Sequence, residues 1–254
     1  MLNLAADGFT TGDVLHGGEA KLSWAARVRA GEPFSRPPAG APSPYFYRPL
    51  VALGEAAAAL PPAPPAAAPP PLAVALSVGG NDVRECLWAP AEIPAALAQL
   101  SANYPQVLEK VLAHTPNVVL LMCYQPSLAD ATYNLYEVLE AVPLPGGGGL
   151  SGHQKLQRLL ETVYQPILAL ARKHRLAVVD LPRSMDPTDG SLFRQQIEPS
   201  HAGGARIAAL IAHAAKAHDA ARDGSRLYVM PGRGEAIVAV ENGEGFVYRV
   251  TDPA

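Results

Sequence analysis

The sequence has few charged residues, few aromatic residues and only two cysteines, and each scarcity excludes a class of protein. Charged side chains make up 17% of the 254 residues and the formal net charge is −3. We therefore expect neither nucleic acid nor a membrane surface as a partner. Two cysteines, Cys86 and Cys123, are too few for a disulfide framework. We expect both to be buried free thiols in a reducing compartment.

Long apolar runs are also missing. Apolar residues reach 49%, but proline interrupts their runs well short of the roughly 20 residues that a membrane-spanning helix needs. No basic segment followed by an apolar stretch opens the chain, so we expect no secretory signal. These absences predict a cytoplasmic protein.

Proline and alanine, in contrast, are abundant. The chain has 26 prolines, and the segment 61–71 reads PPAPPAAAPPP. Proline lacks a backbone N–H and has a fixed φ, so this segment cannot form a helix or a sheet. We expect a semi-rigid polyproline spacer at the surface, within a Pro/Ala-rich insertion over about residues 33–71.

Strand-like and helix-like segments alternate along the chain. Short apolar segments predict buried strands over 2–6, 72–78, 117–124 and 175–181. Apolar periodicity predicts helices over 19–30, 92–113, 151–174 and 202–220. We expect Ser151 to cap the third helix, Pro105 to break the second and Pro166 to kink the third. Such alternation is typical of a three-layer α/β/α domain with a mostly parallel sheet, here over residues 1–222.

The pattern changes after Gly224. The segments RLYVM, AIVAV and FVYRV predict three short strands, and Asn242-Gly243 is a strong hairpin signal. We expect residues 223–254 to form a small antiparallel β-meander packed on the main sheet.

Three sequence blocks carry a family resemblance. The segment ADGFTTG near the start is followed by SWAARV. The segment VALSVGGNDV contains Asn81 and Asp82, and QQIEPSHAGG leads into the last predicted helix. In order and spacing these segments resemble the first, third and last conserved blocks of the SGNH (GDSL-type) hydrolases, over about residues 1–220. The resemblance implies that Asn81 donates a hydrogen bond to the oxyanion of a tetrahedral intermediate.

The departures from the family pattern fall on the catalytic positions. Gly8 stands where the family has its serine nucleophile, Glu198 where it has histidine, and Gln195 where it has aspartate. Glycine has no attacking oxygen, and loss of a nucleophile–base pair costs on the order of 10⁶ in rate. The residues therefore predict weak or no serine-esterase turnover.

We expect the protein instead to bind a small ester-, acyl- or carbohydrate-like ligand in the family's cleft. The cleft would be formed by the loops after residues 6, 78, 124 and 194. The residues expected to line it beside Asn81 are Gly8, Gly79, Gly80 and Tyr124.

Two alternatives remain open at this point. Hydrolysis could use relocated groups, with Thr10 or Thr11 as nucleophile and His201 and Glu198 as partners, or a water activated by Asp7 and Glu198. Alternatively, the chain could be a structural or partner-binding protein. We expect no cofactor, because the glycines at 146–149 lack a P-loop lysine. We expect no metal, because the other histidines, among them His153, show no ligand spacing and are expected to be solvated.

Overall fold

The computed structural model describes residues 9–19, 46–60, 72–86, 90–144, 148–232 and 235–251. The strand predicted over 2–6 and the proline-rich segment 61–71 lie outside these ranges. The same holds for the helix predicted over 19–30, beyond its first residue.

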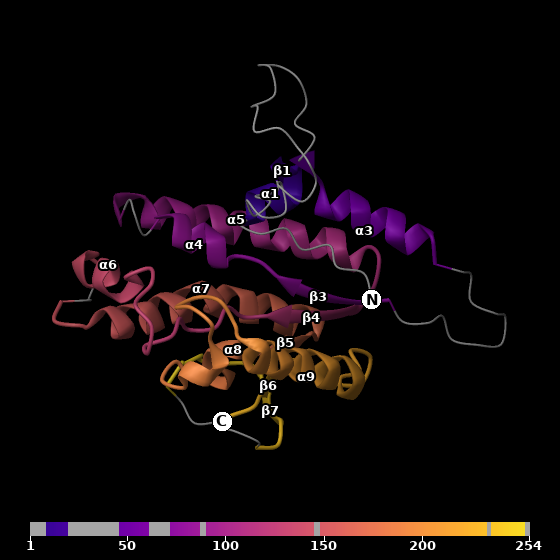
Figure 1. The fold of residues 1–254 in the computed structure, drawn as a ribbon. Helices are drawn as coiled ribbons and strands as arrows, with labels where there is room; N and C mark the ends of the chain where they lie inside the picture. Colours follow the sequence, from indigo (N-terminus) through magenta and orange to yellow (C-terminus); the bar gives the residue numbers. More distant parts are fainter. Residues whose placement is uncertain are drawn as a thin grey trace, which may run out of the picture.

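A five-stranded sheet forms the centre of the molecule (Figure 1). Its strands, in spatial order, are β3 (Ala73–Ser77), β4 (Asn117–Leu121), β5 (Ala177–Val179), β6 (Arg226–Val229) and β7 (Val238–Glu241). The first four run parallel and β7 is antiparallel to β6. The prediction of a mixed α/β protein with a mostly parallel sheet is confirmed. A separate pair, β1 (Gly18–Glu19) and β2 (Phe46–Tyr47), is antiparallel.

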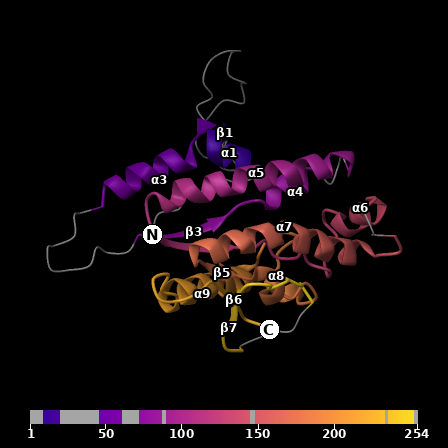
Figure 2. The ribbon, with the colours of Figure 1, turned by 180° about the vertical axis from the view of Figure 1, so that it is seen from behind.

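The two faces of the sheet contact different helices (Figure 2). Val118 and Leu120 of β4 belong to the core that includes α5 (Ile93–Leu112) and α7 (Gly152–His174). Their neighbours Val119 and Leu121 pack instead with α9 (His201–Ala217). Successive side chains of a strand point to opposite faces, so α5 and α7 cover one face of the sheet and α9 contacts the other.

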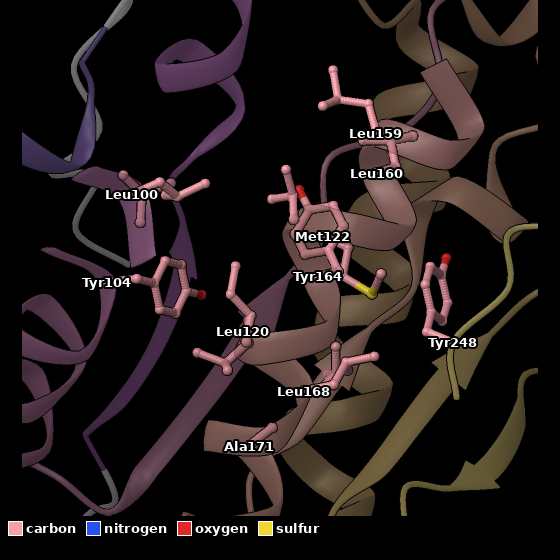
Figure 3. Close-up of a cluster of buried hydrophobic side chains, with 14 of the residues drawn as sticks. Leu100, Tyr104, Leu120, Met122, Leu159, Leu160, Tyr164, Leu168, Ala171 and Tyr248 are labelled. Atoms are coloured by element: carbon pink, nitrogen blue, oxygen red, sulfur yellow. The ribbon is translucent and has the colours of Figure 1, made fainter. Parts of the chain in front are cut away.

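The larger core lies between the sheet and helices α5 and α7 (Figure 3). Tyr104 of α5, Leu120 of β4 and Tyr164 of α7 are each at most 2% exposed. These apolar strands and amphipathic helices are the segments whose periodicity the sequence shows most clearly, and burying their apolar faces drives the chain into this arrangement.

Both long helices contain a proline. Ser151 caps α7 as predicted, since its hydroxyl accepts from the Gln154 N–H at 3.3 Å while the Gln154 side chain accepts from the Ser151 N–H at 3.0 Å. The predicted break at Pro105 is wrong, because α5 continues through it. The neighbouring Tyr104 and Val107 are buried, and this packing outweighs the loss of one backbone hydrogen bond.

Five short helices within the described ranges lack a sequence prediction. They are α1 (Thr11–His16), α3 (Pro49–Ala58), α4 (Gly80–Cys86), α6 (Leu135–Ala141) and α8 (Leu181–Ser184), and single 3₁₀ turns occur at Pro90–Glu92 and Gly190–Leu192. Most span two turns or fewer, which is too short for a periodic apolar pattern to be recognised.

The predicted C-terminal meander forms only in part. Its first two strands are present as β6 and β7 and pair antiparallel, but its third segment, FVYRV, forms no strand. β6 pairs with β5 in parallel within the main sheet, so the expected domain boundary at residues 222 and 223 precedes a strand of that sheet. Residues 246–250 form no strand and lie along α7, where the Gln165 amide donates to the Phe246 carbonyl and accepts from the Tyr248 N–H, both at 3.0 Å. Asn242 does not direct a hairpin between two strands, because its buried amide donates to the Leu168 carbonyl at 3.0 Å.

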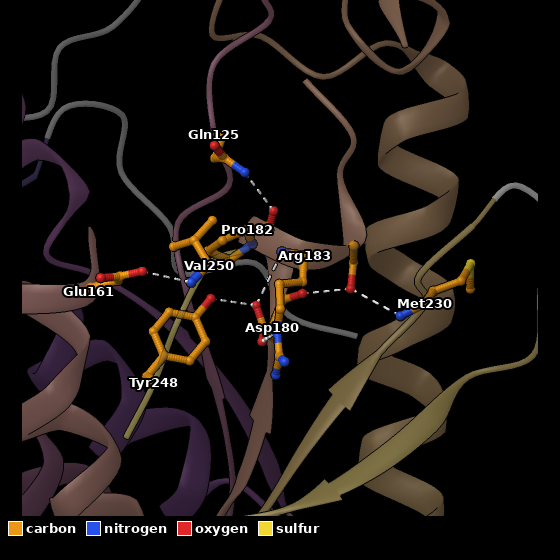
Figure 4. A network of polar contacts seen from close by, with 9 residues as sticks. Gln125, Glu161, Asp180, Pro182, Arg183, Met230, Tyr248 and Val250 are labelled. Atoms are coloured by element: carbon orange, nitrogen blue, oxygen red, sulfur yellow. Dashed lines mark hydrogen bonds and ion pairs between the residues drawn. The ribbon is translucent and has the colours of Figure 1, made fainter. Parts of the chain in front are cut away.

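Asp180 anchors this C-terminal segment at the end of β5 (Figure 4). Its carboxylate accepts from the Tyr248 hydroxyl at 2.9 Å and from the Arg183 N–H at 3.2 Å, and it pairs with the Arg183 guanidinium. Burial raises the pKa of Asp180, against the opposing effect of Arg183. Asp180 is therefore a helix cap and a structural anchor.

Candidate functional site

Asn81 connects the first and third sequence blocks. It lies in the first turn of α4, directly after β3, and its Nδ2 donates to the Phe9 carbonyl at 3.1 Å. The two residues are 72 positions apart in the chain. The loop after β3 is thus in contact with the ADGFTTG block at the carboxyl edge of the parallel sheet, where α/β folds place their ligands.

A buried polar network strengthens the same junction. The Thr11 N–H donates to both Asp82 carboxylate oxygens, at 3.1 and 3.0 Å, and the Thr11 hydroxyl donates to one of them at 2.5 Å. The Asn103 amide of α5 donates to the Thr11 hydroxyl at 3.2 Å. Burial raises the pKa of Asp82, although the hydrogen bonds from Thr11 act in the opposite direction. Because its members are buried and bonded to one another, this network is structural.

Thr10 is the N-cap of α1. Its hydroxyl donates to the Asp13 carboxylate at 2.7 Å and accepts from the Asp13 N–H at 3.2 Å, and the Thr10 N–H donates to the same carboxylate at 2.9 Å. This reciprocal capping box satisfies backbone donors at the start of the helix. The hydroxyls of Thr10 and Thr11, the two relocated nucleophiles considered above, are therefore both engaged in structural hydrogen bonds.

Backbone conformation at Gly79 and close packing at Gly80 both require glycine at the two positions before Asn81. Gly79 has a φ of +108°, which side-chain-bearing residues rarely adopt. A Cβ on Gly80 would lie 2.5 Å from Cys123 Sγ, at the end of β4. Burial raises the pKa of the Cys123 thiol. The GGND segment therefore fits closely between α5 and the end of β4.

Tyr124 connects the end of β4 with the last block. Its hydroxyl donates to the Ile197 carbonyl at 2.7 Å, and its ring lies 6.0 Å from that of Phe193. Burial raises the pKa of Tyr124, with smaller contributions from Cys123 and Glu198. Successive contacts thus run from Phe9 through the GGND loop and the end of β4 to the QQIEPS segment.

Glu198 and His201, the two candidate catalytic residues of the last block, are exposed. Glu198 lies in the turn before α9, and His201 is the first residue of that helix. Gly203 packs closely, since a Cβ there would lie 2.1 Å from the Leu192 carbonyl oxygen. Within the part of the chain that the structure describes, no hydrogen bond or ion pair joins Glu198 or His201 to Asn81 or to either threonine.

The remaining predicted site residues lie outside the described ranges. Asp7 and Gly8 precede the first described residue, so the predicted carboxylate pair of Asp7 and Glu198 stays a prediction.

His153 was expected to be solvated, and this expectation is wrong. Its Nε2 lies 2.8 Å from Oε1 of Gln125, the residue that follows Tyr124 in the chain. The Gln125 Nε2 donates to the Pro182 carbonyl at 2.9 Å, which orients the amide oxygen toward the imidazole. The Gln157 Nε2 lies 3.3 Å from the same imidazole nitrogen. Burial lowers the pKa of His153. No motif in the sequence indicates this contact, which depends on the fold.

Comparison with protein-family models, with curated proteins and with solved structures finds no match to this chain. The described residues contain no group of three or more histidine, cysteine, aspartate or glutamate side chains placed to hold a metal ion. Among the same residues, no helix is both long enough and apolar enough to cross a bilayer.

Proposed function

We propose that the protein is an SGNH-hydrolase-like binding protein. It holds a small ester-, acyl- or carbohydrate-like ligand at the carboxyl edge of its sheet, with weak or no esterase turnover. The arrangement of α5 and α7 on one face and α9 on the other supports a three-layer α/β/α domain of this type.

The observation that carries the proposal is the position of Asn81. Its amide has two N–H groups, and the hydrogen bond to the Phe9 carbonyl at 3.1 Å fixes the side chain at the junction of the first and third blocks. In this proposal the second N–H donates to a carbonyl or acyl oxygen of the ligand. An oriented donor of this kind binds the ligand oxygen whether or not a reaction follows.

The engaged threonine hydroxyls support binding over turnover. A nucleophile needs a base within hydrogen-bond reach. Each threonine hydroxyl does donate to a carboxylate, Asp13 for Thr10 and Asp82 for Thr11. Both carboxylates, however, also accept backbone N–H groups, in the α1 capping box and in the buried network. Activating either hydroxyl would disrupt a helix cap or the buried network, so these contacts weigh against relocated hydrolysis.

Equilibrium binding of 4-nitroacetanilide, the slowly reacting amide analogue of p-nitrophenyl acetate, tests the proposal. Titration followed by NMR should show saturable binding, and Asn81→Ala should weaken it by about tenfold through loss of one hydrogen bond. Asn117→Ala is the matched control, because this exposed asparagine begins β4 at the opposite edge of the sheet. Equal affinities of the wild type and Asn81→Ala would refute the proposed site.

Turnover is measured in parallel with p-nitrophenyl acetate. We expect a rate close to that of the uncatalysed reaction in the wild type, Asn81→Ala and His201→Ala. Rapid hydrolysis that is lost in both variants would support an active hydrolase with relocated residues instead.

A further inference from the structure

We propose that a hollow beside Gln195 is a binding site for a neutral pyranose ring. The hollow measures about 540 Å³, opens to solvent, and is lined by Thr132, Tyr133, Asn134, Glu137 and Val138. The inference is argued from the hollow alone and goes beyond the proposed function.

The wall of the hollow is held in place before any ligand arrives. Gln196 is 2% exposed, and its Oε1 accepts from the N–H groups of Tyr133 and Leu135, both at 3.2 Å. Asn134 between them has the left-handed φ of 50°, an unusual conformation for a residue other than glycine. A wall fixed in this way loses little conformational freedom when a ligand binds.

The lining chemistry matches a sugar ring. Tyr133 is 37% exposed and offers a rigid aromatic surface, and Val138 adds a half-buried aliphatic contact. A pyranose has faces of C–H groups, which suit the negative face of an aromatic ring, and a rim of hydroxyls. The exposed side chains of Asn134 and Glu137 are polar groups of the kind that pair with those hydroxyls.

The charge of the lining selects against other ligands. None of the five lining residues is cationic, and Glu137 is a carboxylate, so an anionic sugar would be repelled. A quaternary ammonium ion would need an aromatic cage, but Tyr133 is the one aromatic residue among the five. A neutral ring fits the lining best.

The hollow is also joined to the last sequence block. The Tyr133 hydroxyl donates to Gln195 Oε1 at 3.1 Å, and Gln195 lies three residues before Glu198. The preceding loop is fixed to the same segment, since the Ser127 N–H donates to the Gln196 carbonyl at 2.7 Å. A saccharide in the hollow would therefore lie next to the last block.

Isothermal titration of the full chain with cellotriose tests the saccharide site, with trigalacturonate as the anionic and choline as the cationic comparison. We expect cellotriose to bind and the other two not to bind. Tyr133→Ala should raise the Kd for cellotriose by about tenfold, because it removes the aromatic contact. Tyr133→Phe keeps the ring, so its Kd should stay within about threefold even though the bond to Gln195 is lost.

A matched pair of carboxylate variants on α6 controls for charge and folding. Glu137→Gln should weaken cellotriose binding by about threefold or more, whereas Glu140→Gln, which changes an exposed carboxylate outside the hollow, should leave it unchanged. Circular dichroism of each variant confirms the fold. The inference is overturned by absent cellotriose binding, by equal affinities of the wild type and Tyr133→Ala, or by Tyr133-dependent binding of choline or trigalacturonate.

Failure of this inference is separable from failure of the proposed function. Asn81-dependent binding of 4-nitroacetanilide without any cellotriose binding overturns the saccharide site and leaves the proposed function standing. Tyr133-dependent cellotriose binding without 4-nitroacetanilide binding supports the saccharide site and refutes the acyl-binding site proposed at Asn81.

Discussion

The two family-like regions at the carboxyl edge of the sheet differ in how their polar residues are used. At the junction of the first and third blocks, Thr11 and Asp82 are buried and bonded to each other. In the last block, Glu198 and His201 are exposed and make no hydrogen bond with that junction in the described part of the chain. The comparison teaches that polar residues near one edge of a sheet can be scaffold in one region and face solvent in another.

The largest effect should come from Asp82→Ala. This substitution leaves the N–H and hydroxyl of Thr11 buried without their acceptor, so we expect a loss of about 3 kcal/mol of unfolding free energy. Urea denaturation followed by circular dichroism measures it. Asp82→Asn keeps one acceptor oxygen and should lose less. A loss below about 0.5 kcal/mol in Asp82→Ala, typical of surface positions, would contradict the structural role of the junction.

Gly80→Ala should have the next largest effect. The new Cβ would lie 2.5 Å from Cys123 Sγ, and such overpacking costs about 1–3 kcal/mol. Cys123→Ala removes the sulfur, so the same glycine substitution should cost clearly less in that background. Thermal and urea unfolding of the four proteins complete the double-mutant cycle. Additive losses would show that the loop and the end of β4 do not pack as described.

Thr10→Ala should cost about 1 kcal/mol, the usual value for removal of an N-cap side chain. Thr10→Ser should recover most of that loss, because serine also caps helices. Neither variant should change the background rate with p-nitrophenyl acetate. A rate that falls in Thr10→Ala and returns in Thr10→Ser would identify Thr10 as a nucleophile. The polar residues at the junction of the first and third blocks would then not be scaffold alone.

The smallest effects on stability should come from Glu198→Ala and His201→Ala. Both side chains are exposed, so each change should stay within about 0.5 kcal/mol in urea unfolding. A loss of several times that size in either variant would mean that Glu198 or His201 also supports the fold, and the contrast with Thr11 and Asp82 would disappear.

Buried strands and long helices could be predicted from the sequence because their apolar patterns are long and regular. Ser151 capping and the buried strand β4 are examples. β3 forms where it was expected, but its side chains alternate between exposed and half-buried, so the expectation of a buried strand is wrong there. The pairing of the C-terminal strands could not be predicted, because short apolar segments do not reveal whether a strand such as β6 joins the central sheet in parallel.

The candidate site was predictable only as a set of blocks. The GGND and FTT segments do meet, through Asn81 and Phe9. The sequence does not reveal that the threonine hydroxyls are engaged, that His153 bonds to Gln125, or that Tyr133 reaches Gln195, because each contact joins segments brought together by the fold.

The central claim is that this edge of the sheet binds a ligand without an activated hydroxyl. Incubation of the full chain with a fluorophosphonate, followed by intact-mass measurement and peptide mapping, tests it most directly. The account predicts an unmodified mass under conditions that fully label an active serine hydrolase. A stoichiometric adduct on Thr10, Thr11 or any other hydroxyl of the chain would contradict it.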